Sequence, residues 1–157
     1  MGGESMAEKI ALACDHAGIL LKPHVIEVLE ELGFAYQDFG AHGGDSVDYP
    51  VYGARAALAV ARGECGRGIV LCGTGVGISM AVSKVRGIRC AVCSEPYSAA
   101  MSRLHNDANM LALGARVVGS ELAKLIVRTW LTTDFDGDRH ARRVGQIMAL
   151  ERGEALE

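Results

Sequence analysis

The segment of this sequence best suited to chemistry is a cysteine followed by a glycine-rich turn. An apolar run at residues 68–71 leads into Cys72, and a helical pattern begins at Ile78, after Gly73, Thr74, Gly75, Val76 and Gly77. Glycines let backbone amides approach a ligand, and the start of a helix adds partial positive charge. The turn is therefore predicted to bind an anion. The alternative is a tight strand-to-helix connection without a ligand.

Cys72 is the candidate for the reacting group. It ends the predicted strand, and open α/β sheets bind ligands at the carboxyl ends of their strands. A thiol beside polar groups at a helix start can act as a thiolate, which serves as base or nucleophile. Thr74 adds a hydroxyl within the turn. The alternative is a small buried hydrophobic residue, the common role of a cysteine in a strand.

Two polar residues follow the first predicted strand, at residues 9–14. Asp15 and His16 should lie at the same sheet edge as Cys72, because parallel strands end together. They could bind sugar hydroxyls or a phosphate. Asp15 could also cap the next helix, and the two roles are compatible.

Two further pairs of residues are candidates for substrate contacts. Arg139 and Arg143 are spaced i, i+4 and share a helix face, where paired guanidiniums suit a phosphate. A solvated face, or ion pairs with the neighbouring aspartates, is the alternative. His105 and Asn106 end a predicted helix, where C-capping is the alternative role.

Other reactive side chains are not predicted to form a site. In a strand, Cys90 and Cys93 face opposite sides, which argues against a redox pair or a metal site. The histidines at positions 24, 42 and 140 show no convincing metal-binding arrangement.

Alternating strands and helices must position these residues. Strands are predicted at 9–14, 34–39, 68–71, 89–93 and 110–113, and helices at 19–32, 49–62, after the glycine turn, from 95 to about 105, at 120–132 and at 139–152. The pattern predicts a single-domain, doubly wound, Rossmann-like sheet of five parallel strands, with helices on both faces and an extra C-terminal helix. Residues 9–152 are predicted to be the domain, 1–8 an extension or cloning remnant, and 153–157 a tail.

Composition limits the compartment and the partners. Of the 157 residues, 50% are apolar and the net charge is −3, which predicts one globular domain without a basic surface for nucleic acid. No apolar run is long enough to span a membrane, and the N-terminus lacks the pattern of a signal peptide. The five cysteines are odd in number, which favours reduced thiols. The expected location is the cytoplasm.

Seven segments together resemble a known family, the type B ribose-5-phosphate isomerases, within a wider group that includes allose- and galactose-6-phosphate isomerases. The segments are CDHAG (14–18), DYP (48–50), CGTGVGIS (72–79), CSEPYSA (93–99), SRLHND (102–107), ARVVG (115–119) and RHARRV (139–144). The resemblance runs from about residue 9 to residue 151. It implies an aldose–ketose isomerase of phosphosugars that needs no cofactor and no metal.

The same resemblance implies residue roles. Cys72 would be the base that moves a proton between C1 and C2, and His105 the acid that opens the sugar ring. Thr74 and the backbone of the turn would hold the enediolate. Relatives without the cysteine use a glutamate at the position of Ile78, so the cysteine version applies here. Substrate or phosphate contacts are implied for Asp15, His16, Gly73, Gly75, Val76, Gly77, Asn106, Arg116, Arg139 and Arg143.

The role of His105 that the resemblance implies, combined with the predicted topology, predicts a homodimer, or a dimer of dimers, with shared active sites. His105 ends a helix that returns to the opposite sheet edge from Cys72, so if His105 opens the ring, a partner chain must present it.

Three other functions are alternatives to ribose 5-phosphate isomerisation. The preferred phosphosugar could instead be allose 6-phosphate or galactose 6-phosphate. A non-catalytic nucleotide- or phosphate-binding module would use the same turn. A cysteine phosphatase is disfavoured, because the loop after Cys72 holds no arginine.

Overall fold

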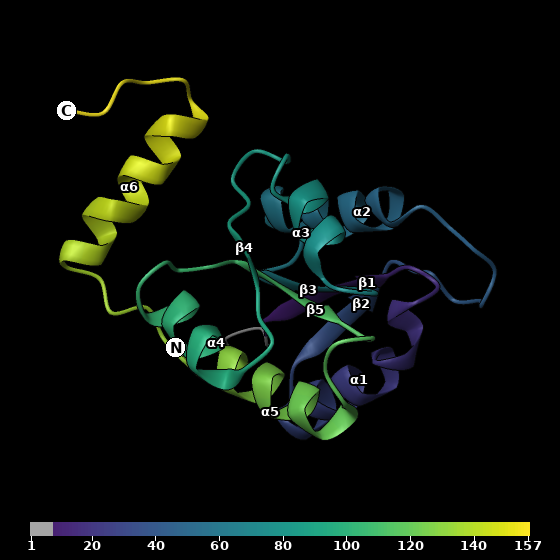
Figure 1. Ribbon diagram of the computed structural model, residues 1–157. Coiled ribbons are helices and arrows are strands. Elements are labelled where there is room, and N and C mark those ends of the chain that lie inside the picture. The colour runs from purple at the N-terminus through teal and green to yellow at the C-terminus, as the bar shows by residue number, and fades with distance from the viewer. Residues whose placement is uncertain (1–7) are drawn as a thin grey trace, which may run out of the picture.

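Five short segments form one parallel sheet in the computed structural model, which describes residues 8–157 (Figure 1). The strands are β1 (Lys9–Cys14), β2 (Ala35–Asp38), β3 (Arg67–Cys72), β4 (Cys90–Val92) and β5 (Met110–Gly114), in the spatial order β2-β1-β3-β5-β4. The predicted five-stranded sheet is confirmed. The edge strands β2 and β4 are shorter than predicted, and each pairs with a single neighbour.

Helices cover both faces of this sheet (Figure 1). One layer holds α1 (Lys22–Glu31), α4 (Pro96–Leu104) and α5 (Ser120–Leu131), and the other holds α2 (Tyr49–Ala61) and α3 (Val76–Val82). Successive strand residues point to opposite faces, so Leu71 packs in the first layer while Cys72 packs in the second.

The helix predicted at 19–32 is interrupted. A 3₁₀ turn, η1 (Gly18–Leu20), comes first, and α1 begins only at Lys22, with Pro23 in its first turn. Gly18 lies so close to β3 that an added Cβ would be 2.4 Å from the Leu71 carbonyl oxygen. This close approach sets the path of the chain before α1, and only glycine permits it.

The direction in which successive strands are added to the sheet reverses between β1 and β3. From β1 the chain first builds β2 on one side, then returns to build β3 on the other. In such sheets the carboxyl ends of the two strands flank a crevice where ligands bind. Cys14 and Leu71 are paired at those ends, so the residues that follow them share that crevice.

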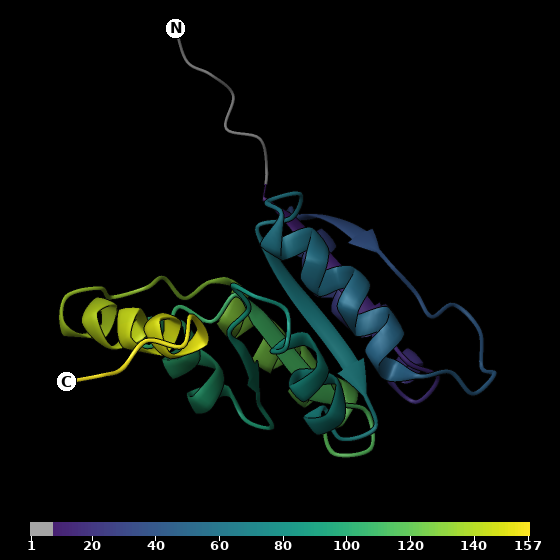
Figure 2. The same cartoon turned by 90° about the horizontal axis from the view of Figure 1, so that it is seen from above.

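The last helix, α6 (Arg139–Glu151), extends away from the sheet (Figures 1 and 2). His140 is its only buried residue, while Ile147 and Leu150 are exposed. Its far end is tied to the body where the Gly87 amide donates to the Glu151 carboxylate at 3.1 Å. Most of α6 therefore presents its side chains outward.

The structure does not describe the whole N-terminal segment. Residues 1–7, most of the predicted extension, lie outside the described range. Within residues 8–157, no helix combines the length and the apolar character that crossing a bilayer requires.

Candidate active site

The Cys72 side chain ends β3 and is enclosed by the turn that follows it. Its Sγ accepts a hydrogen bond from the Gly75 amide at 3.1 Å, and the residue is 4% exposed. Gly75 has φ +81°, and an added Cβ would lie 2.9 Å from the Leu113 carbonyl carbon. Both features require glycine, so this residue is needed to bring the amide to the sulfur.

The rest of the turn presents polar groups to solvent. Thr74 is exposed, and its Oγ1 accepts from the Val76 amide at 3.2 Å. Among the described residues, the Thr74 amide has no acceptor. The first amides of α3, including that of Gly77, have no partner within the helix. These donors surround the position beside Cys72.

Asp15 and His16 lie at the neighbouring strand end, as predicted. Asp15 is buried, and its Oδ1 accepts from the Ala17 amide at 3.0 Å and the Gly18 amide at 2.9 Å. These bonds close a turn before η1, but Asp15 is not the N-cap of a helix, since Ala17 and Leu21 occupy those positions in η1 and α1. Its Oδ2 has no hydrogen-bond partner within residues 8–157 and remains for a ligand.

The hydrogen bond to His16 determines its tautomer. The Val47 amide donates to Nδ1 at 3.1 Å, so that nitrogen carries no proton. A neutral His16 therefore carries its proton on Nε2, which can donate to a sugar or phosphate oxygen.

Tyr49, for which the sequence predicted no role, also lines this site. Tyr49, at the start of α2, borders an open cavity of about 570 Å³ with Asp15 and His16. Its ring packs against the glycine turn, where a Cβ added to Gly77 would lie 2.7 Å from the tyrosine Cζ. The DYP segment held the signal, but the contact depends on how α2 packs against α3.

Arg116 joins the same edge from the end of β5. Its amide donates to the Gly73 carbonyl at 2.9 Å, and a Cβ added to Gly73 would lie 3.3 Å from its Nη1. The structure thus gathers Cys72, the turn, Asp15, His16, Tyr49 and Arg116 at one edge of the sheet.

His105 and Asn106 lie at the opposite edge. They end α4 just before β5, whose first residue, Met110, pairs with Gly68 at the start of β3. Cys72 pairs with Gly114 at the other end of the same strands. A five-residue strand spans roughly 17 Å, so His105 does not meet Cys72 of the same chain. His105 also forms the predicted C-cap, since its amide donates to the Met101 carbonyl at 2.8 Å.

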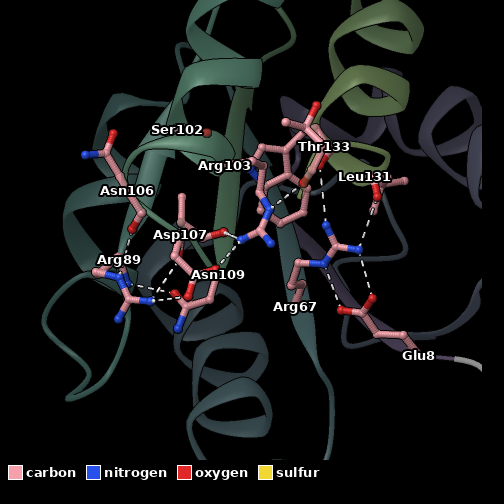
Figure 3. Close-up of polar contacts among 12 residues, drawn as sticks. Glu8, Arg67, Arg89, Ser102, Arg103, Asn106, Asp107, Asn109, Leu131 and Thr133 are labelled. Atoms are coloured by element: carbon pink, nitrogen blue, oxygen red, sulfur yellow. Dashed lines mark hydrogen bonds and ion pairs between the residues drawn. The ribbon is translucent and has the colours of Figure 1, made fainter. Parts of the chain in front are cut away.

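Arginines hold this second edge rigid (Figure 3). Arg89 donates to the carbonyls of Asn106 at 3.2 Å and Asp107 at 2.8 Å. Arg103 donates to the Ala108 carbonyl at 2.7 Å and forms an ion pair with Asp107 at 2.9 Å. The segment after α4 is therefore held in one conformation, and the Asn106 side chain points outward from it.

α6 adds Arg139 and Arg143 beside His105. The rings of His105 and His140 are stacked, with centroids 4.1 Å apart, which brings the start of α6 against the end of α4. Both arginines are exposed, and within the described chain neither forms an ion pair, so the alternative of pairing with the neighbouring aspartates is absent.

Cys90 and Cys93 do not join either cluster. Cys93 packs in the core of the α1, α4 and α5 layer, while Cys90 packs against the α2 and α3 layer, as the strand geometry predicts. Burial raises the pKa of Cys90 to about 12 and that of Cys93 to about 11, so both stay protonated at neutral pH. Among residues 8–157, no three His, Cys, Asp or Glu side chains gather as a metal site would need.

The chain is similar to known proteins over most of its length. The family model described as Ribose/Galactose Isomerase matches residues 10–147. The chain is 53% identical to ribose-5-phosphate isomerase B of Escherichia coli, over 92% of this chain and 97% of that protein. It is 40% identical to D-erythrulose-4-phosphate isomerase of Pectobacterium atrosepticum, over 92% and 96%.

A solved structure supports the same family. Ribose-5-phosphate isomerase B of Clostridium thermocellum superposes with a TM-score of 0.90 at 56% identity, covering 92% of this chain and 98% of that one. Similarity over nearly the whole length of the relatives, together with the shared fold, shows that this chain belongs to the Ribose/Galactose Isomerase family.

Proposed function

We propose that the chain interconverts ribose 5-phosphate and ribulose 5-phosphate through an enediolate. The observation that carries the proposal is the Cys72 sulfur held by the Gly75 amide, because it places a thiol within a turn of backbone donors. Enediolate chemistry needs a base beside groups that stabilise an oxyanion, and this turn offers both. The names of the relatives from E. coli and C. thermocellum support the same reaction here.

In the proposed reaction, His105 first opens the furanose by protonating the ring oxygen while the C1 hydroxyl loses its proton. The Cys72 thiolate then takes the proton from C2 and returns it to C1, while a proton passes from O2 to O1. The Thr74 hydroxyl and the turn amides stabilise the negative charge on the enediolate oxygens.

The other candidate residues bind the substrate. Asp15 Oδ2 and His16 Nε2 face the crevice and are suited to hydroxyl and phosphate oxygens. Arg139 and Arg143 are suited to the phosphate, with Asn106 and Arg116 as further contacts. Phosphate binding at the distant end helps to hold the reacting carbons against Cys72.

We further propose a homodimer in which each active site combines two chains. Cys72 with Asp15 and His16 would come from one chain, and His105 with Asn106 and the α6 arginines from the other. The separation of the two clusters along β3 supports this, because neither contains both a base and a ring-opening acid. A two-fold axis would create two equivalent sites. A dimer of dimers remains compatible with the same interface.

Exposed apolar side chains support such an interface. Val76, Met80, Val92 and Tyr97 are between 44% and 72% exposed, and they surround the Cys72 edge and the edge strand β4. Ile147 and Leu150 on α6 are also exposed, and α6 lies away from the sheet (Figure 2). Apolar groups in these positions are suited to burial against a second copy.

Hydrogen exchange with solvent tests the reaction itself. In D2O, the protein should interconvert ribose 5-phosphate and ribulose 5-phosphate and introduce deuterium at the exchanging carbon, which NMR detects. Cys72→Ala should abolish both effects while still binding the sugar phosphate. A wild-type protein that binds the sugar without conversion or exchange would instead be a non-catalytic phosphate-binding module.

A second candidate substrate class deserves measurement. The Pectobacterium relative carries the name of a tetrose phosphate isomerase, and the reacting end of all these sugars is the same. The kcat/KM values for ribose 5-phosphate, allose 6-phosphate, galactose 6-phosphate and erythrulose 4-phosphate would rank them. Ribose 5-phosphate should have the highest value.

We place this enzyme in the cytoplasm, acting as one isomerase domain over residues 9–152 with a short tail at 153–157. All five cysteines are free, which suits a reducing compartment.

A further inference from the structure

The His140 ring lies flat against the ring of His105. Their centroids are 4.1 Å apart and their planes differ by 9°. His105 ends α4, and His140 lies in the first turn of α6. The Asp136 amide also donates to the Leu104 carbonyl at 3.0 Å, which ties the same two segments together. The stack is therefore a fixed contact between the end of α4 and the start of α6.

His140 makes this contact with the face of its ring rather than with its polar atoms. It is 6% exposed and is the only buried residue of α6. Its Nε2 atom is buried and has no hydrogen-bond partner within the described chain. Buried polar atoms usually have hydrogen-bond partners. Because Nε2 has none among the described residues, the contact that explains the position of His140 is its ring stack rather than a hydrogen bond.

The surroundings of His140 favour a neutral ring. Burial lowers its pKa, and the nearby His105, Arg139 and Arg143 lower it further, while Asp136 acts in the opposite direction. Two stacked imidazolium rings would repel each other, whereas a neutral aromatic face attracts a cation. A neutral His140 therefore presents an uncharged ring face to His105.

We infer that His140 is the positioning residue of His105: its ring face holds the His105 ring in the orientation that protonates the ring oxygen of the sugar. The inference rests on the proposed function, in which His105 opens the furanose. His140 itself needs no contact with the substrate, because it acts through His105.

The two directions of the reaction separate this role from a general structural one. Ribose 5-phosphate is mainly a closed ring and must be opened. Ribulose 5-phosphate has its O5 blocked by the phosphate, so it cannot close a furanose ring. Proton exchange at its C1 in D2O therefore needs Cys72 but no ring opening, while conversion of ribose 5-phosphate needs both.

Matched variants make the test specific. His140→Ala should lower kcat for ribose 5-phosphate roughly 10-fold or more, within the range that acid–base catalysis contributes, and leave KM and C1 exchange of ribulose 5-phosphate near wild type. His140→Phe keeps a flat uncharged ring and should restore most of the lost rate. In a His105→Ala background, His140→Ala should have no further effect, because the two act as one unit. His24→Ala, on α1, is the control histidine.

Each of three results would overturn the inference: unchanged turnover in His140→Ala, an equal loss in both assays, or losses that add in the double variant. Thermal unfolding checks that each variant is folded, and His140→Gln replaces the alanine variant if the latter does not fold. Failure of the proposed function would look different, since the wild-type protein would then perform neither reaction.

Discussion

At Cys72, the same side chain satisfies the requirements of both a core residue and a base. It packs in the α2 and α3 layer, yet its sulfur accepts a backbone hydrogen bond from a turn whose other donors face outward. Packing alone does not need a donor at the sulfur. Measurements of turnover, rather than of stability, therefore distinguish the role of Cys72 as a base from its role in packing.

Cys72→Ala should lower kcat by roughly 100-fold or more, the scale of removing a general base, while ribose 5-phosphate still binds. Steady-state kinetics and a binding titration measure the two effects. Cys90→Ala is the matched control and should retain near wild-type turnover, because that thiol stays protonated. Normal turnover in a folded Cys72→Ala protein would exclude Cys72 as the base.

His140 should make stability depend on pH. Its pKa is lowered in the folded protein, mainly by burial, so the unfolded chain binds more protons below its usual pKa of about 6.5. Above about pH 6.5 the ring is neutral in both the folded and the unfolded chain and lowers stability in neither case. As the pH falls toward the folded-state pKa, the unfolded chain takes up the proton first and the free energy of unfolding decreases. The thermal midpoint of His140→Phe should therefore fall less steeply below pH 6.5 than that of wild type. Parallel curves would show that His140 titrates normally.

At the scale of elements, the end of β5 supports the glycine turn through close backbone contact. A Cβ added to Gly114 would lie between 2.5 and 2.7 Å from the Thr74 backbone. Neither backbone can yield without moving the turn that holds Cys72.

Gly114→Ala should therefore destabilise the protein by about 1–3 kcal/mol, the usual cost of overpacking, and also lower kcat. Denaturant unfolding gives the first effect, and turnover under native conditions gives the second. Gly43→Ala, where an added Cβ meets nothing within 4 Å, should change neither. An active, fully stable Gly114→Ala protein would show that the turn tolerates displacement.

The first turns of α6 place two guanidiniums on one exposed face. Arg143→Ala should raise KM about 10-fold or more, because a hydrogen bond to a charged group contributes roughly 1.5–3 kcal/mol. It should also weaken inhibition by phosphorylated acids. Arg142→Ala removes an exposed guanidinium one position away and should leave KM unchanged. Equal KM values for the wild type, Arg143→Ala and Arg142→Ala would mean that Arg143 faces solvent and does not bind the phosphate.

At the scale of the whole molecule, the proposed base and the proposed ring-opening acid lie at opposite edges of one sheet. The register of β3 and β5 sets this separation, since Gly68 pairs with Met110 and Cys72 with Gly114. No side-chain rotation can cross that distance. The proposed site, which needs both groups, would therefore have to combine two chains.

Mixing inactive Cys72→Ala and His105→Ala proteins after reversible dissociation should restore activity. A mixed dimer has one intact site and one site with both lesions, so random mixing should give roughly a quarter of the wild-type activity. Subunit exchange is verified with differently tagged chains. If exchange is complete and activity stays absent, Cys72 and His105 act within one chain.

Some of the site was predictable because strand ends can be recognised locally. Cys72, Asp15 and His16 each follow an apolar strand, and parallel strands place such residues at one edge. Tyr49 and His140 could not be predicted in the same way. Their contacts depend on how α2 packs against α3 and how α6 meets α4, which no local pattern encodes.

The sequence by itself determined the strands, most of the helices and the glycine turn, because apolar periodicity and glycine positions act over a few residues. It also determined that His105 ends a helix returning to the far edge. Only the tertiary structure decided the break at Gly18, the hydrogen bond from Gly75 to the Cys72 sulfur and the stack of His140 on His105. Each of these is a contact of a few ångströms, set by how whole elements pack in three dimensions.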